Sequence, residues 1–343
     1  MPKELEDGTN SAGVAAAAFE RLELIGHSPA FRDALRLIER IAAVDATVLV
    51  QGETGTGKEL ATRAIHYLSR RRHDPFVPVN CAALPDNLLE SELFGHERGA
   101  FTDAKQARRG LVAQAEGGTL YLDEVEAMSP RAQGVLLRFL QDHSYRPVGG
   151  QRLARGDLRI VASSNVDLQA LAARGQFRQD LLFRLGVLSV TMPPLRRRGD
   201  DARLLAEHFV RRFARQHGRP EKRLHPDCAA WMARHPWPGN VRELENLMLR
   251  ELLLGDGDSI RVGDEDPAAA EAGPEVDLDQ AFQPAKARAI SVFERHYLSR
   301  LLARAGGNIS LAARLSRKDR SALNKLVKKH GLGGVQRETA AGP

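Results

Sequence analysis

The sequence contains little of what a membrane or secreted protein requires. No run of apolar residues approaches the roughly 18 that a membrane-spanning helix needs, so we expect no membrane contact. The apolar stretch at residues 14–19 is too short and too weakly apolar for a secretion signal. Cys81 and Cys228 are the only cysteines, and their spacing matches neither a disulfide framework nor a metal site. These absences favour a protein of the reducing cytoplasm.

What the chain does have is length, apolar content and positive charge. Its 343 residues suffice for two or more domains, and 43% apolar residues can build their cores. The formal net charge is +6, which permits nucleic-acid binding without proving it. The position of that charge along the chain is therefore more informative than its sum.

The most informative stretch is a glycine-rich turn between a predicted strand and a predicted helix. Residues 47–51 form a β-branched apolar run, and residues 59–66 repeat apolar residues at helical spacing. The turn between them, Gly-Glu-Thr-Gly-Thr-Gly-Lys, has the context of a phosphate-binding P-loop, in which the lysine reaches the terminal phosphates. An ordinary flexible turn is the alternative, which three alternate glycines ending in lysine disfavour. The residues expected at the nucleotide are Gly52, Glu53, Thr54, Gly55, Thr56, Gly57, Lys58 and Glu59.

One position departs from the general P-loop pattern. Glu59 stands where that pattern has the Ser or Thr hydroxyl that ligates magnesium. We therefore expect the metal to be held differently in this chain.

Residues 117–124 predict an apolar strand that delivers two acids, Asp123 and Glu124, at its end. An NTPase needs one carboxylate to bind Mg²⁺ and a second to orient and polarise the attacking water. We assign Asp123 to the metal and Glu124 to the water. The alternative is that the two acids are simply solvated at the end of a strand, which the presence of a P-loop in the same chain disfavours.

Apolar runs alternate with helical patterns through the first two thirds of the chain. Strands are expected at residues 48–50, 76–79, 119–122, 158–163 and 187–192. This alternation predicts an α/β fold, a parallel sheet with helices on both faces. The predicted division is a flexible leader (1–22), an α/β core (23–195), a helical lid (196–262), a linker rich in Asp, Glu, Ala and Pro (263–284), a last helical unit (285–332) and a tail (333–343).

Several segments resemble the bacterial enhancer-binding proteins, the AAA+ activators of sigma-54 RNA polymerase. Residues 92–104, Glu-Leu-Phe-Gly-His-Glu-Arg-Gly-Ala-Phe-Thr-Asp-Ala, look like the surface loop that defines this family. Residues 79–84, 177–184, 193–196 and 237–244 match the same family in order and spacing, and the resemblance covers about residues 24–253. It implies an AAA+ P-loop NTPase that uses ATP and Mg²⁺ and assembles a ring, a hexamer by family resemblance.

The resemblance also implies roles around the nucleotide. Asn80 would hold Glu124 in an inactive hydrogen bond until the nucleotide state releases it. Asn165, at the end of the fourth strand, would be the first sensor, close to the γ-phosphate. Arg242, at the start of a lid helix, would be the second sensor and would touch the phosphates of the same subunit.

Two further arginines, Arg178 and Arg184, would be arginine fingers that reach the nucleotide of a neighbouring subunit. Surface ion pairing is the alternative for these residues and for the arginine run at 196–198. If the fingers act between subunits, an isolated monomer should hardly turn over, because a finger supplies roughly 10³–10⁵ in rate.

The defining loop contains an aromatic residue beside a threonine, flanked by small residues. Such an aromatic has no core to fill, and an exposed aromatic often marks a contact surface. Asp103 occupies a position that is usually Gly in the family, which adds charge and removes backbone freedom. We expect residues 128–133 to support this loop, although a plain turn is the alternative. The resemblance assigns sigma-54 contact, through Phe101 and Thr102 at the tip, to Gly99, Ala100, Phe101, Thr102, Asp103 and Ala104.

The last helical unit reads as two short helices joined by a tight turn. Asn308 and Asp319 are the expected N-caps, and Gly331 ends the second helix. The pair resembles the Fis-like helix-turn-helix of the same family, except that Arg317 and Lys318 replace the Gly and apolar residue expected in the turn. A solvated lysine-rich helix is the alternative. For DNA we expect base contacts from Arg320, Ser321 and Asn324 and phosphate contacts from Lys325, Lys328 and Lys329.

These features predict a sigma-54-dependent activator that binds enhancer DNA and uses ATP hydrolysis in a ring to remodel the closed complex of sigma-54 RNA polymerase. Too few residues precede Leu24 for a phosphoacceptor domain, so we expect control by a separate regulatory protein or by expression level. One alternative is a DNA-binding regulator that works with the ordinary polymerase, ATP only switching its oligomeric state; Asp103 favours it. Another is an unrelated AAA+ remodeller, such as a helicase loader or unfoldase, which the sigma-type loop disfavours.

Overall fold

The computed structural model describes residues 15, 18–86, 88–101, 104–255, 257–262, 290–291, 294, 297–298, 301–302, 305, 308–316 and 318–330. The chain divides into two compact units, residues 1–263 and 264–343, and each is considered by itself. The predicted linker and tail lie outside the described residues, as do Thr102, Asp103, Arg317 and Gly331. Within the described part of the chain, no helix is long and apolar enough to cross a membrane.

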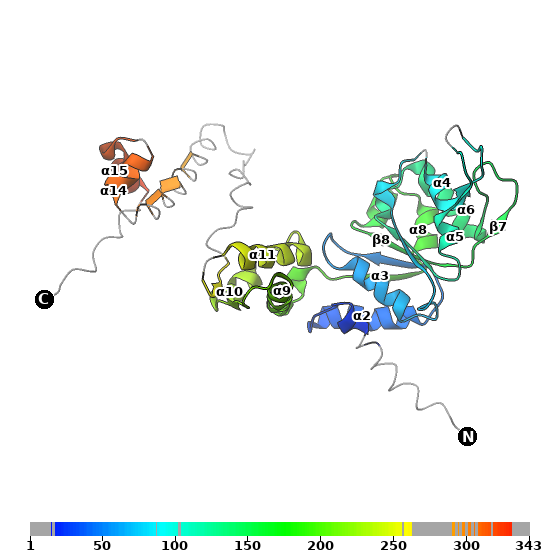
Figure 1. Cartoon of the computed structure of the whole chain (residues 1–343), viewed down its shortest axis with the longest axis horizontal. Coiled ribbons are helices and arrows are strands. Elements are labelled where there is room, and N and C mark those ends of the chain that lie inside the picture. Colours follow the sequence, from blue (N-terminus) through cyan, green and yellow to red (C-terminus); the bar gives the residue numbers. More distant parts are fainter. Residues whose placement is uncertain are drawn as a thin grey trace, which may run out of the picture. The chain divides into compact units, whose positions relative to one another are not determined.

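A five-stranded parallel sheet forms the centre of the first unit (Figure 1). Its strands are β1 (Val48–Gln51), β2 (Phe76–Asn80), β5 (Thr119–Asp123), β8 (Arg159–Ser164) and β9 (Leu188–Thr191), in the order β2-β5-β8-β1-β9. The predicted strands and their parallel arrangement are confirmed. Because parallel strands end at one edge, the turn after β1 and the acids at the end of β5 lie at the same edge of the sheet.

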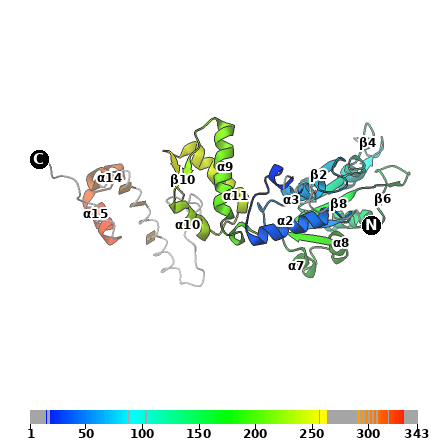
Figure 2. The same cartoon turned by 90° about the horizontal axis from the view of Figure 1, so that it is seen from below.

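Side chains alternate across the sheet, so each strand contributes to two apolar layers. Val48 and Val50 pack on one face with α2 (Pro29–Ala42) and α3 (Lys58–Tyr67). Leu49 points to the other face, which is covered by α4 (Leu89–Phe94), α5 (Leu111–Gln114), α6 (Pro130–Asp142), α7 (Leu168–Ala173) and α8 (Gln179–Leu185). Figure 2 shows α7 and α8 side by side and α2 along the sheet.

The predicted flexible leader extends too far. Residues 18–21 are helical, and Phe19 and Leu22 pack against the apolar layer of α2, α3 and β1. Burial of these two side chains stabilises the ordered conformation. The surrounding alanines gave no clear helical periodicity, which explains the error.

The predicted lid consists of α9 (Asp201–His217), α10 (Asp227–Arg234) and α11 (Asn240–Leu254) around their own apolar core (Figure 1). Trp237 is 1% exposed, and its ring N–H donates to the carbonyl oxygen of Met232 at 3.0 Å. Strands β10 (Arg223–Leu224) and β11 (Ser259–Ile260) pair in parallel beside the helices. The predicted change from α/β to mostly helical structure near residue 196 is confirmed.

A buried ion pair joins the start of the lid to the segment before α2. The Arg198 Nε atom lies 3.1 Å from Asp201, and the two side chains are 3% and 4% exposed. The same carboxylate accepts hydrogen bonds from the backbone N–H groups of His27 at 2.7 Å and Ser28 at 3.1 Å. Surface ion pairing is therefore the wrong interpretation for this arginine.

Asp201→Ala should lower the free energy of unfolding by about 3–5 kcal/mol, because it leaves a buried guanidinium without its counter-charge. Urea unfolding followed by circular dichroism measures the change. Asp200→Ala is the matched control, since the side chain of Asp200 is 85% exposed and its removal should cost less than about 0.5 kcal/mol. Equal losses in the two variants would contradict a special role for the buried pair.

The second unit contains α14 (Ile309–Leu315) and α15 (Arg320–Lys329). The side chains of Asn308 and Asp319 each accept hydrogen bonds from two backbone N–H groups, so both predicted N-caps are confirmed. A small apolar core includes Leu298, Leu301, Ala312, Ala313, Leu323 and Val327.

Candidate active site at the carboxyl edge of the sheet

The turn after β1 adopts backbone conformations that favour glycine. Gly55 and Gly57 have φ angles of +78° and +93°, and Gly57 is the N-cap of α3. A Cβ atom on Gly55 would lie 2.3 Å from the carbonyl oxygen of Gly239, so a larger residue does not fit there. The turn therefore leads directly into a helix N-terminus, where backbone N–H groups can bind phosphate.

Lys58 is 7% exposed and its ammonium group lies inside the turn. The Nζ atom donates to the carbonyl oxygens of Gly52 at 2.8 Å and Glu53 at 3.0 Å, and to Asn165 Oδ1 at 2.6 Å. Burial lowers the pKa of this group, while three nearby carboxylates oppose the shift: Asp123, Glu126 and Glu124. The structure thus brings the predicted P-loop lysine together with both predicted acids and the predicted sensor.

Asp123 is oriented by two hydroxyl groups. Its Oδ1 atom accepts hydrogen bonds from Tyr121 Oη at 2.8 Å and from Ser163 Oγ. Burial raises the pKa of Tyr121, so its hydroxyl remains a donor. Within the described residues, the other oxygen of Asp123 accepts no hydrogen bond, which leaves it available to an external ligand.

Glu124 follows β5 in a left-handed backbone conformation, with φ +56°. Its Oε1 atom accepts a hydrogen bond from Asn165 Nδ2 at 3.0 Å. Among the described residues no hydrogen bond joins Asn80 to Glu124; the Asn80 Oδ1 atom accepts from the backbone N–H of Ala82 at 2.8 Å, and the nucleotide-dependent role of Asn80 stays a prediction. An asparagine at a strand end readily caps the following turn, here Cys81–Ala83.

The start of α11 lies directly on the P-loop. The Val241 N–H donates to Gly55 O at 3.0 Å, and Asn240 Nδ2 donates to Thr54 O at 3.0 Å. Asn240 is fully buried and also accepts from the Leu195 N–H at 2.8 Å. Sequence reasoning missed this residue, although the Trp-Pro-Gly-Asn turn before a lid helix could have indicated it.

The predicted second sensor, Arg242, occupies the first turn of α11 beside Gly55. Its positive charge lies close enough to lower the pKa of Lys58, although burial has the larger effect. Among the described residues, Arg242 has no hydrogen-bond or ion-pair partner. This placement fits the predicted contact with phosphates bound by the same chain.

The P-loop residue Glu53 is paired with Arg196, at the start of the lid. Arg196 Nη1 lies 2.7 Å from Glu53 Oε2, and a second guanidinium–carboxylate contact completes a bidentate pair. Asn240 Nδ2 donates to the same carboxylate at 3.2 Å. These contacts lower the pKa of Glu53 to about 2, and the hydrogen bond from Arg196 has the largest effect.

Arg196→Ala should therefore raise the pKa of Glu53 toward its ordinary value of about 4.3. Because the folded-state pKa is depressed, the stabilisation is present above pH ~4.3 and is lost as the pH falls toward about 2. Carbon-detected NMR titration of the Glu53 carboxyl measures the shift directly. Arg197→Ala removes a neighbouring charge that makes no such bond, and an equal shift in that variant would argue against the specific pair.

The side chains of three other predicted site residues make no contact with this group. Glu59 pairs with Arg63 at 2.8 Å on the surface of α3. Arg178 forms a bidentate pair with Asp180 at 3.0 and 2.8 Å. Arg184 is exposed in α8, the helix that Arg178 caps, and has no hydrogen-bond or ion-pair partner in the part of the chain that the structure describes.

The candidate sigma-contact loop begins after α4 with β3 (Gly95–His96). Phe101 is 40% exposed, and its ring lies 4.9 Å from the ring of His96. The Gly99 N–H donates to Ala104 O at 2.8 Å across the base of the loop. The tip positions Thr102 and Asp103 lie outside the described residues, so their roles stay predictions.

The segment that supports this loop differs from the prediction. The Glu97 N–H donates to Val148 O at 3.0 Å, and the Val148 N–H donates to Gly95 O at 2.8 Å. Residues 128–133 instead contact the start of α4, where Arg131 pairs with Glu90 at 3.2 Å. Sequence reasoning missed the pairing with Val148, because backbone pairing between distant loops leaves no periodic signal in the sequence.

Helix α15 exposes part of the predicted DNA-contact set. Arg320, Lys325 and Lys328 are exposed, and Asn324 is half-buried. Ser321 Oγ donates to its neighbour Asp319 at 2.5 Å, and Lys329 Nζ lies 2.9 Å from Glu294. These two side chains have partners within the unit, which weakens their assignment as DNA contacts.

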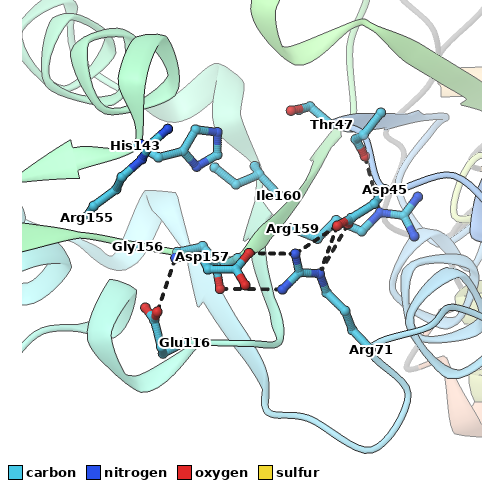
Figure 3. Close-up of a pocket in the computed structure, with 12 residues that line it drawn as sticks. Asp45, Thr47, Arg71, Glu116, His143, Arg155, Gly156, Asp157, Arg159 and Ile160 are labelled. Carbon is cyan, nitrogen blue, oxygen red and sulfur yellow. Dashed lines mark hydrogen bonds and ion pairs between the residues drawn. The ribbon is translucent and has the colours of Figure 1, made fainter.

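A cavity of about 540 Å³ opens at the amino ends of the strands, opposite the P-loop (Figure 3). Arg71 crosses its wall and pairs with Asp45 at 2.8 Å and Asp157 at 2.7 Å. Arg159 is 3% exposed and donates to the carbonyl oxygen of Ile41 at the end of α2 at 2.8 Å. Through these contacts Arg71 and Arg159 tie together the elements around the cavity.

Comparisons with known proteins agree with this geometry. The Sigma-54 interaction domain family matches residues 24–191, and the AAA+ ATPase lid domain family matches residues 196–280. The Nif-specific regulatory protein of Azotobacter vinelandii is 45% identical over 81% of this chain and 54% of its own length. The transcriptional regulatory protein ZraR of Salmonella typhimurium is 41% identical over 90% of this chain and 68% of its own length. The chain thus spans about half the length of several curated relatives that it matches.

Solved structures of related proteins have the same fold. The crystal structure of NtrX from Brucella abortus superposes with a TM-score of 0.66 at 34% identity, covering 94% of this chain and 72% of that one. NtrX in complex with ATP has a TM-score of 0.64 at 36% identity and covers 90% of this chain and 69% of that one. The AAA+ P-loop NTPase fold with a parallel sheet and helical lid is therefore confirmed.

Proposed function

The chain belongs to the family of AAA+ ATPases that carry a sigma-54 interaction domain, and from this premise we propose that it is a sigma-54-dependent transcriptional activator. It hydrolyses ATP and uses the energy to remodel the closed complex of sigma-54 RNA polymerase. The observation that carries the proposal is the pair of hydrogen bonds by which Asn165 connects Lys58 to Glu124. These bonds link the phosphate-binding lysine to the acid that activates water.

The acids fit a magnesium ion held jointly with a nucleotide. Asp123 has one oxygen fixed by hydroxyl groups and one without a partner in the described part of the chain. No group of three or more potential metal-ligating side chains occurs among the described residues. Mg²⁺ commonly takes one or two carboxylates and completes its ligands with phosphates and water. We propose that Asp123 supplies this carboxylate, and that the metal, when bound, neutralises charge on the phosphates.

The protein residues divide the remaining work. Glu124 orients and deprotonates the attacking water, and Asn165 holds Glu124 while contacting Lys58. Arg242 contacts the phosphates in its own chain, whereas Arg178 and Arg184 reach the nucleotide of the next chain in a ring, a hexamer by family resemblance. This arrangement makes hydrolysis depend on assembly.

The two remaining functions belong to the loop and to the last helices. We assign sigma-54 contact to residues 99–104, supported by the exposure of Phe101. We assign enhancer DNA to the helix-turn-helix of residues 285–332, supported by the exposed Arg320, Lys325 and Lys328 of α15. The proposed division is a core that ends at residue 195 and begins before residue 23, since Phe19 and Leu22 pack against it, followed by the lid (196–262), the linker (263–284) and the DNA-binding unit.

Open-complex formation on a sigma-54 promoter tests the whole function. Purified chain, sigma-54 RNA polymerase, promoter DNA with upstream sites and ATP should give permanganate-reactive DNA at the start site, and ADP should not. Footprinting of the upstream region, repeated at rising salt, reports DNA binding separately. Hydrolysis and DNA binding without open complexes would instead favour a regulator of the ordinary polymerase, the reading suggested by Asp103.

Thr102→Ala should leave ATP hydrolysis unchanged and abolish open-complex formation. The family resemblance assigns Thr102 to the tip of the sigma-contact loop, so its loss should affect only the contact with sigma-54. ATPase assays and pull-down with sigma-54 measure the two effects. Thr191→Ala, on an exposed position of edge strand β9, is the control for loss of a threonine, and normal transcription by Thr102→Ala would refute the loop assignment.

A further inference from the structure

A third carboxylate, Glu126, lies beside the two assigned to catalysis. It belongs to the short 3-10 turn Val125–Ala127 that follows β5. Its Oε1 atom accepts a hydrogen bond from the backbone N–H of Asn165 at 2.9 Å. The side chain therefore crosses from the end of β5 to the end of the adjacent strand β8.

Asn165 contacts both the phosphate-binding lysine and the catalytic acid. Its Oδ1 atom accepts from Lys58 Nζ at 2.6 Å, and its Nδ2 atom donates to Glu124 Oε1 at 3.0 Å. Both groups of one amide are thus occupied by the lysine and the catalytic acid. Any displacement of the Asn165 backbone would change both contacts together.

The second carboxylate oxygen of Glu126 lowers the stability of the folded protein. Glu126 Oε2 is buried and has no hydrogen-bond partner among the described residues. A buried polar group without a partner typically costs about 1–3 kcal/mol, more when charged. A side chain with such a cost and a purely packing role would be expected to be apolar. The hydrogen bond to Asn165 is the contact that only a carboxyl or amide at this position can make.

We propose that Glu126 is a positioning residue, which holds the Asn165 backbone so that its amide keeps Glu124 and Lys58 in register for hydrolysis. The inference rests on the ATPase function proposed above. It assigns to the chain a catalytic support that neither the P-loop nor the two acids provide. Misplacement of a catalytic group by about 1 Å can cost 10²-fold in rate.

Three substitutions separate the hydrogen bond from the charge. Glu126→Ala removes the acceptor, and Glu126→Asp keeps the charge but is too short to reach Asn165; both should lower kcat about tenfold or more. Glu126→Gln keeps a carbonyl acceptor without the charge and should retain most of the activity. The glycine turn itself is untouched, so any change in the Kd for fluorescent ATP should be much smaller than the loss in kcat. Glu207→Ala, on exposed helix surface beside Arg203, is the control.

Hydrogen exchange gives a readout that does not need turnover. The Asn165 amide should exchange faster in Glu126→Ala and Glu126→Asp than in the unsubstituted chain and in Glu126→Gln, in peptides spanning residues 160–170. If neither the unsubstituted protein nor any Glu126 variant hydrolyses ATP, the proposed function is refuted. The hydrogen-exchange pattern would still test the positioning role of Glu126. Equal kcat and exchange in all variants, or a Gln variant as impaired as the Ala variant, would overturn the proposal.

Discussion

Arg178→Ala protein should hydrolyse ATP about 10³-fold more slowly than the unsubstituted chain, even at concentrations that favour a ring. The guanidinium is half-exposed and paired with Asp180, and an exposed pair of this kind contributes only about 0–1 kcal/mol. The side chain can therefore leave Asp180 at little cost, as the proposed contact with the nucleotide of a neighbouring chain requires. There it would stabilise the charge that develops on the transferred phosphoryl group.

A mixing experiment distinguishes catalysis between chains from catalysis within one chain. Lys58→Ala protein lacks the phosphate-binding lysine but carries intact fingers, whereas Arg178→Ala protein has the opposite defect. If the finger acts on the neighbour's nucleotide, a mixture should recover activity that neither protein has alone. Steady-state phosphate release against mixing ratio measures this recovery, and Arg215→Ala, at the exposed end of α9, controls for loss of a surface arginine. A mixture that stays inactive would place the finger in its own chain or outside catalysis.

Glu124→Gln should bind ATP normally and lose turnover by about 10²-fold or more, because an amide cannot accept the proton of the attacking water. The substitution keeps the shape of the side chain and an oxygen that can accept from Asn165 Nδ2. The lysine, the glycine turn and Arg242 remain in place, so the Kd for ATP should change little. Single-turnover hydrolysis and fluorescent-nucleotide binding measure the two quantities separately.

The Glu124→Gln prediction has a matched control and a clear contradicting result. Glu207→Gln changes an acid of the same type in an exposed ion pair on α9 and should hydrolyse ATP like the unsubstituted chain. Unchanged hydrolysis by Glu124→Gln would remove this residue from the role of base. The water would then have to be activated by another acid of the same edge.

Much of the site could be predicted from the sequence because its parts follow strands directly. The P-loop follows β1, the acids end β5, and Asn165 follows β8. Parallel strands place these ends together whatever the loops do elsewhere. For Asn80 the structure shows only a local contact, in which Oδ1 accepts from the Ala82 N–H, so its contact with Glu124 stays a prediction.

The sequence by itself determined the strands, the helices, the glycine turn and the acids, because periodicity and turn chemistry act over a few residues. Contacts between distant segments were decided only by the tertiary structure: Arg196 with Glu53, Asn240 with Thr54, and Glu126 with Asn165. Each joins residues that are adjacent only after the sheet and lid have folded. Their geometry depends on packing, which no local pattern of residues encodes.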